Sequence, residues 1–201
     1  MKKIATALLF VLAAPFAQAG EGDWRFTVGA HNVNPKSDNG SLAGGALDVE
    51  VGSNWRPTIT AEYFLNDNLG IEVLAALPFK HEVKLNGAYA GEVTHLPPTV
   101  SLQYHFSPDA KISPYLGAGL NFTWIYSEDS AGPIAGTELK LKNSWGLAAH
   151  AGVDFKMEND WFFGVDARWM DIDSDVSVNL AQVGTVNIDP IVYGFYFGKR
   201  F

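Results

Sequence analysis

Residues 99–106 read Thr-Val-Ser-Leu-Gln-Tyr-His-Phe, so that an apolar side chain follows a polar one at every step. In an extended chain Val100, Leu102, Tyr104 and Phe106 therefore share one face, and the polar side chains share the other. A strand of this kind either covers a core or faces lipid with its apolar side. The same alternation recurs along the chain, and this repetition indicates the fold class.

Seven more segments show the period of two, each close to the roughly ten residues that a membrane-crossing barrel strand needs. They are residues 24–33, 56–64, 69–80, 115–124, 145–155, 161–170 and 188–201. With the stretch at 99–106 the count is eight, an even number, as in bacterial membrane barrels. The sequence thus predicts an all-β fold, an eight-stranded antiparallel up-and-down transmembrane β-barrel.

The connections between these segments alternate in length. Short turns are expected at residues 65–68, 107–111 and 158–160. Long segments rich in Gly, Asp, Asn and Ser are expected at residues 35–54, 81–98, 127–143 and 171–187. A barrel inserted into the outer membrane has short periplasmic turns and long extracellular loops. Both chain ends are then predicted to lie on the periplasmic side.

Aromatic residues gather near both ends of the predicted strands, where hydrocarbon meets lipid headgroups. Near the periplasmic ends lie Trp24, Tyr63, Tyr104, Phe106, Tyr115, Trp161, Phe163 and Phe201. Near the outer ends lie Trp55, Phe79, Trp124, Tyr126, Trp145 and Trp169. The alternative is a soluble lipocalin-type barrel, whose apolar face surrounds a ligand, but it would leave both girdles and the terminal Phe201 unexplained.

The first 19 residues have the three parts of a secretory signal peptide. Met1-Lys2-Lys3 precedes an apolar run from Ile4 to Ala14, and the triplet Ala17-Gln18-Ala19 predicts cleavage after Ala19. The run is shorter than the about 20 apolar residues that a transmembrane helix needs. We therefore expect a cleaved signal at residues 1–19 and a single barrel domain at residues 20–201, located in the bacterial cell outer membrane.

The composition excludes several classes of function. Without Lys2 and Lys3 the 14 basic residues fall to 12 against 22 acidic ones, so the mature net charge is −10. An acidic protein of this kind is not expected to bind nucleic acid. Cysteine is absent, which excludes disulfides and thiolate metal sites. We expect neither a cofactor nor a metal.

The inward-facing positions divide the lumen into two halves. A polar plug of opposite charges is expected near the periplasm, because an unpaired buried ion is costly. It comprises Arg25, Glu62, Glu72, His105, Asp154, Asp166 and Arg200. Toward the outer end a candidate substrate channel is assigned to Leu74, Ala76 and Met170, with Val33 and Pro78 nearby. Alternatively Leu74 and Met170 merely fill a lumen that eight strands leave narrow.

Other patterns that carry chemistry are incomplete. Residues 171–175 resemble the opening of a calcium loop, but Val176 stands where Gly is required and Gln182 where the last Glu is required. His81 begins a zinc-protease pattern, yet Leu85 occupies the second histidine position. No Ser, His and acid combine at one strand end. The sequence predicts a protein that is not an enzyme.

Five further segments carry a family resemblance: Asn66–Glu72, Pro78–His81, His95–Tyr104, Pro114–Gly119 and Ser144–Gly146. In this order they resemble segments of the OmpW family of outer-membrane proteins. The resemblance implies a narrow, largely apolar channel for small hydrophobic molecules that opens sideways into the bilayer. In that family a proline near the start of the fourth strand is associated with the gap, and Pro97 or Pro98 matches its position.

The leading hypothesis is a passive outer-membrane channel for small hydrophobic molecules, with lateral release where Pro97 and Pro98 remove donors from the strand ladder. The alternative is a structural or interaction barrel whose acidic extracellular loops bind surface partners or cations. The expected partners are outer-membrane lipid and lipopolysaccharide, small hydrophobic solutes, and an insertion machinery that recognises the C-terminal strand ending at Phe201.

Overall fold

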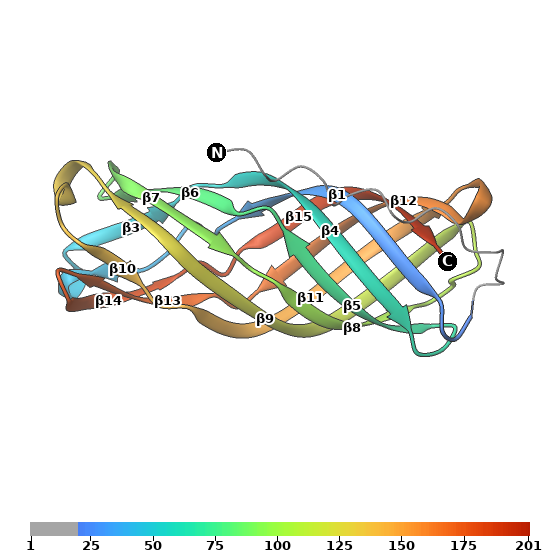
Figure 1. The fold of residues 1–201 in the computed structure, drawn as a ribbon. Coiled ribbons are helices and arrows are strands. Elements are labelled where there is room, and N and C mark those ends of the chain that lie inside the picture. The colour runs from blue at the N-terminus through green and yellow to red at the C-terminus, as the bar shows by residue number, and fades with distance from the viewer. Residues whose placement is uncertain (1–19) are drawn as a thin grey trace, which may run out of the picture.

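Eight strands form a closed antiparallel barrel in the structure, a computed structural model that describes residues 20–201. The expected signal peptide, residues 1–19, lies outside the described residues. In chain order the strands are β1 (Trp24–Asn34), β4 (Asn54–Phe64), β5 (Leu69–Ala76), β8 (Thr99–His105), β9 (Ile112–Ser130), β11 (Ser144–Lys156), β12 (Trp161–Met170) and β15 (Ile191–Arg200). Each pairs with the next and β15 pairs with β1, which confirms the predicted up-and-down barrel (Figure 1).

The alternation in the sequence corresponds to the two faces of the wall. On β8, Thr99, Ser101 and Gln103 are buried inside the barrel, whereas Val100 and Leu102 are 51% and 53% exposed on its outer surface. Glycine and small polar residues alternate with large apolar ones in the same way along β9 and β11. A surface covered by apolar side chains fits a wall that faces hydrocarbon instead of water.

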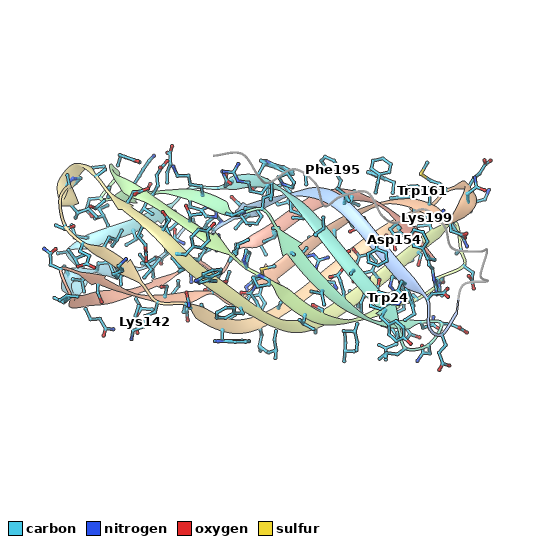
Figure 2. All side chains as sticks on the ribbon, in the orientation of Figure 1. Trp24, Lys142, Asp154, Trp161, Phe195 and Lys199 are labelled. Atoms are coloured by element: carbon cyan, nitrogen blue, oxygen red, sulfur yellow. The ribbon has the colours of Figure 1, made fainter. Side chains whose placement is uncertain are left out.

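Aromatic side chains of the outer surface contact one another near both ends of the barrel. The ring centroids of Trp24 and Tyr63 are 5.2 Å apart at one end, and those of Trp124 and Tyr126 are 5.2 Å apart at the other. Figure 2 shows Phe195 projecting outward from the wall. Two of the residues predicted for the girdles do not belong to these bands, because Tyr115 and Phe79 are buried inside the structure.

The long outer connections contain further strands, which the sequence analysis described only as loops. These are β2 (Ser41–Leu42), β3 (Leu47–Val51), β6 (Phe79–Leu85), β7 (Ala88–Leu96), β10 (Leu139–Leu141), β13 (Asp173–Val178) and β14 (Ala181–Asn187). Strand β7 pairs with β9, β6 with β7 and β3 with β6, which prolongs the wall, while β10, β13 and β14 form a separate sheet. Both groups extend the barrel beyond the eight wall strands, at the left in Figure 1.

Two predicted strands are shorter by three or more residues in the structure, whereas β9 is longer than predicted and runs to Ser130. The strand expected at residues 69–80 ends at Ala76, and β6 begins at Phe79. Pro78 lies between them and has no N–H to donate to a ladder, which accounts for the interruption. The last strand begins at Ile191 instead of residue 188, directly after Pro190.

Three single turns of 3-10 helix complete the fold: η1 (Ala43–Gly45), η2 (Gly132–Ile134) and η3 (Glu158–Asp160). In the turn between β4 and β5, Asn66 Oδ1 accepts hydrogen bonds from the backbone N–H groups of Asn68 and Leu69. These hydrogen bonds stabilise a tight turn, so the connection between β4 and β5 is short. No helix among residues 20–201 has the length and apolar character needed to cross a bilayer.

Candidate functional site

Arg25 holds together the part of the lumen nearest the short turns. Its Nη2 donates to Asp154 Oδ1 at 2.7 Å, and its Nη1 lies 3.5 Å from Glu62 Oε2. The guanidinium carbon also lies 4.1 Å from the centre of the Phe162 ring. All of these side chains are buried, so the positive charge is balanced by carboxylates and by an aromatic face rather than by water.

The network continues across the lumen from Glu62. His105 Nε2 lies 3.0 Å from Glu62 Oε1, and Gln103 Nε2 donates to Glu62 Oε2 at 3.2 Å. Gln103 Oε1 in turn accepts a hydrogen bond of 2.9 Å from His150 Nε2. Because β4, β8 and β11 each contribute one or two of these residues, the network connects strands on different sides of the barrel.

A second ion cluster surrounds Arg168, which the sequence placed inward but did not assign to the plug. Arg168 Nη1 donates to Glu72 Oε1 at 2.6 Å, and its Nε donates to Asp166 Oδ2 at 2.6 Å. His31 Nε2 lies 2.7 Å from the other oxygen of Asp166, and His31 Nδ1 lies 2.6 Å from the Thr58 hydroxyl. The polar alternation of Asp166 and Arg168 was the signal for this cluster.

Two tyrosines add a hydroxyl chain that the sequence analysis did not identify. The Tyr115 and Tyr196 hydroxyls are 2.7 Å apart, and Tyr196 donates to Asp154 Oδ1 at 2.7 Å. Gly152 and Gly164 make room for the two rings, since an added Cβ would lie 2.4 Å from Tyr115 and 2.3 Å from Tyr196. Inward glycines on neighbouring strands therefore indicate where large side chains fill the lumen.

Six of the seven predicted plug residues lie in these two clusters, and Arg200 lies apart from them. Arg200 Nε donates to Asp23 Oδ2 at 3.1 Å, and its guanidinium stacks 3.8 Å from the centre of the Phe64 ring. It lines a small cavity of about 50 Å³ at the inner mouth. The side chains of the two clusters fill the lumen above this cavity and form what we call the floor.

Leu74 and Met170, two of the predicted channel residues, are packed directly above the floor. They are buried with Val33, Ala148 and Val192 in one apolar cluster, and Ala76 packs against its edge. Leu74 and Met170 do not line the cavity described next. Their position fits the alternative interpretation, in which they fill the lumen, better than a role in contacting a solute.

The outer part of the lumen contains an apolar cavity of about 200 Å³. Its walls come from the strands of the outer extension, and apart from two histidines all the lining side chains are aliphatic. They include Leu47, Val49, Val83, Leu85, Ile125, Leu139, Leu141, Val176, Val183 and Ile188. Short alternating runs such as Leu47-Asp48-Val49-Glu50-Val51 were the sequence signal for these walls.

The histidines His81 and His95 lie at one side of this cavity with their polar atoms turned toward each other. Their Nε2 atoms are 2.9 Å apart, and His81 Nδ1 lies 2.5 Å from the carbonyl oxygen of Gly52. Since Gly52 O can only accept, His81 carries its proton on Nδ1 and accepts from His95 Nε2 when both rings are neutral. Among the described residues His95 Nδ1 has no hydrogen-bond partner, and the two rings present carbon atoms to the cavity.

The barrel wall is interrupted beside this cavity. The β5–β8 ladder ends at the pair Leu74 and Thr99, and the β6–β7 ladder begins at the pair Phe79 and His95. Between these pairs residues 75–78 face residues 96–98, which include Pro97 and Pro98. No backbone hydrogen bond joins the two segments in the part of the chain that the structure describes.

Carboxylates also gather at the base of the β13–β14 hairpin, just beyond the end of β12 and just before the start of β15. Oxygen atoms of Asp171, Asp173 and Asp189 lie within 4.8 Å of one another, and Lys36 Nζ lies 2.7 Å from Asp189 Oδ2. Burial and the neighbouring Asp189 and Asp171 carboxylates raise the pKa of Asp173. Carboxylate oxygens are ligands for hard cations, but Asp189 is already paired with Lys36. The segment forms a strand hairpin rather than a calcium loop.

A barrel with an apolar outer surface, two aromatic bands and a filled lumen defines the class of outer-membrane β-barrel proteins. Comparison with known proteins identifies the family within this class. The model of the OmpW family matches residues 20–201. The chain therefore belongs to the OmpW family and is an outer-membrane protein, as the sequence predicted.

Individual relatives agree with this assignment. The chain is 36% identical to Outer membrane protein W of Escherichia coli K12 over 213 residues, covering 100% of both chains. It is 27% identical over 206 residues to the dibenzothiophene metabolism operon protein PahQ of Pseudomonas aeruginosa, covering 96% of this chain and 95% of that protein. The crystal structure of OprG from Pseudomonas aeruginosa superposes with a TM-score of 0.80 at 32% identity, covering 90% of this chain and 97% of OprG.

Proposed function

We propose that this protein is a passive conduit that admits small hydrophobic molecules from outside and releases them sideways into the outer membrane. The observation that carries the proposal is the apolar cavity, which lies above a closed polar floor and beside an interrupted wall. A solute in the cavity meets charged side chains below it and a missing ladder at its side. The sideways route is the one that does not require desolvating ions.

The chemistry of the cavity supports hydrophobic solutes. An apolar cavity of about 150 Å³ in a protein core stays dry and binds benzene, so a cavity of about 200 Å³ lined by Leu, Val and Ile suits a molecule of that kind or somewhat larger. The name of the relative PahQ refers to metabolism of dibenzothiophene, a flat apolar molecule. This name supports the same solute class for this chain.

The position of the gap supports lateral release. His95 lines the cavity and lies two residues before Pro97, so the interruption begins where the cavity wall ends. Pro97 and Pro98 have no N–H and cannot donate to the facing segment. On the outer surface of that segment Leu77 is 57% exposed, so an apolar solute leaving the gap would meet a hydrocarbon-like surface.

Uptake of a radiolabelled medium-chain hydrocarbon tests the proposal. We would compare cells lacking the protein, cells with it, and cells carrying the double variant Pro97→Ala and Pro98→Ala, which restores two N–H donors to the wall. Pro108→Ala, in the turn between β8 and β9, is the matched control. We expect uptake that requires the protein, is lost in the double variant and is kept in the control.

Two results would contradict the proposal. Equal uptake with and without the protein would exclude transport of that solute and favour the alternative, an interaction barrel that acts through its acidic outer hairpins. Uptake unchanged by the double variant, with normal insertion of the protein, would exclude release at the prolines. Deletion of the β13–β14 hairpin then distinguishes the remaining explanations, since an interaction barrel requires its outer hairpins.

A further inference from the structure

Asn121 lies on the luminal face of β9, directly beside the interrupted part of the wall, and is fully buried. Its Nδ2 lies 3.2 Å from the carbonyl oxygen of Pro97, 3.3 Å from that of Pro98 and 3.0 Å from the hydroxyl of Thr99. One side chain of β9 therefore binds both prolines from inside the lumen. Neither the cavity nor the floor explains why an amide should stand at this position.

The orientation of the amide is fixed by its partners. The two proline carbonyl oxygens can only accept, so the NH2 group of Asn121 must face them. On the other side Thr123 Oγ1 donates to Asn121 Oδ1 at 2.7 Å, and Thr123 is also fully buried. Every hydrogen-bonding group of the Asn121 side chain is thus engaged in holding the prolines or in being held itself.

The carbonyl of Pro97 is diverted from the position that a regular strand would give it. The carbonyl oxygen of Pro98 accepts the backbone N–H of Phe122 on β9 at 3.0 Å. Successive carbonyls of a strand point to opposite neighbours, so the oxygen of Pro97 would normally point away from β9 and toward residues 75–78. Instead it meets Asn121 Nδ2 and the Thr99 hydroxyl, the latter at 3.2 Å.

The facing segment offers a donor to that same space. Leu77 N–H donates to the carbonyl of Pro57 on β4 at 3.0 Å, and Arg56 Nε donates to the carbonyl of Pro78 at 2.8 Å. By the same alternation the N–H of Ala76, one residue before Leu77, points toward the prolines. Each side of the gap is thus tied to the strand behind it, and not to the other side.

From this arrangement we propose that Asn121 is a positioning residue that keeps the gap open. It holds the Pro97 carbonyl inside the lumen, where the oxygen cannot accept the Ala76 N–H and close the ladder. Thr123 assists by orienting the amide. The role in transport rests on the proposed lateral release, whereas the effect of Asn121 on the Ala76 N–H can be measured independently of any solute.

Amide hydrogen exchange in lipid nanodiscs, resolved by NMR, tests the inference directly. In Asn121→Leu, which keeps the volume but removes the donors, the Pro97 carbonyl is released and we expect exchange at Ala76 to slow about fivefold to tenfold, as one new hydrogen bond would cause. Thr123→Val should slow it less, because the amide remains but is no longer oriented. Ser113→Ala, at another buried inward position of β9, is the control and should change nothing.

Unchanged or faster exchange at Ala76 in both Asn121→Leu and Thr123→Val would overturn the inference. If Asn121→Leu does not fold, Thr123→Val still tests the inference, because valine is nearly isosteric with threonine. Hydrocarbon uptake by the same variants should fall in the order of their exchange effects. If the wild-type protein transports no hydrocarbon, the proposed function fails, while the exchange at Ala76 still decides whether Asn121 controls the gap.

Discussion

At the inner end of the lumen, charged side chains from different strands bind one another across the barrel, as Arg25 does with Asp154 and Arg168 with Glu72. At the outer end, aliphatic side chains face each other across the apolar cavity. The eight wall strands carry the floor, whereas the strands of the outer extension supply most of the cavity walls. In the proposed mechanism the floor blocks the direct route, and the cavity and the gap offer a lateral one.

The largest effect is expected from breaking the floor. Arg168→Met leaves the buried carboxylates of Glu72 and Asp166 without their cation, so we expect the free energy of unfolding to fall by about 3–5 kcal/mol. Lys142→Met removes an exposed ion pair with Asp175 and should leave the free energy of unfolding almost unchanged. Urea unfolding in lipid vesicles measures both. Equal effects of the two variants would mean that the floor does not stabilise the barrel.

A smaller effect, on transport rather than on stability, is expected from filling the cavity. Val183 lines the cavity on β14, and Val183→Trp should reduce hydrocarbon uptake about tenfold, a change of about 1.4 kcal/mol in the barrier. Leu180→Trp, on the exposed turn of the same hairpin, is the matched control. Uptake that is equal in the two variants would show that solutes bypass the cavity.

The smallest effect concerns the acidic outer hairpin. The raised pKa of Asp173 means that the folded hairpin binds the proton of Asp173 more tightly than the unfolded chain does. Ionisation of Asp173 therefore opposes folding as pH rises through the folded-state pKa. Asp173→Asn should slow amide exchange in β13 at neutral pH and have no effect at a pH below the usual range of carboxyl pKa values. A larger effect at low pH would contradict this sign.

The sequence predicted the wall better than the lumen. Strand alternation is a local property, so residues 99–106 and 161–170 alone reveal which side chains face outward. Which inward residues meet is decided by the stagger of strands around the barrel, which no local pattern contains. For this reason Arg168 was assigned to the inward face but not to the ion cluster, and the partners of Asn121 were not foreseen.

The cavity was missed for a different reason. Many of its lining residues come from short strands, such as β10 (Leu139–Leu141) and β14 (Ala181–Asn187), between turns that contain glycine, asparagine and aspartate. Against that polar background the alternation was interpreted as loop. The same choice placed the candidate channel at Leu74 and Met170, one layer below the cavity, because the predicted wall strands stopped there.

Photochemical labelling of the lumen tests the central claim most directly. A hydrocarbon that carries a diazirine would be bound to the protein in nanodiscs and irradiated, and the labelled residues would be located by mass spectrometry. Only inward side chains would be counted, and only where an excess of octane suppresses the labelling. The account predicts labels on cavity residues such as Ile125 and at the gap on Thr99, and none on Tyr115 or Phe162 in the floor. Labels on Tyr115 and Phe162 would show that solutes pass through the floor and would contradict lateral release.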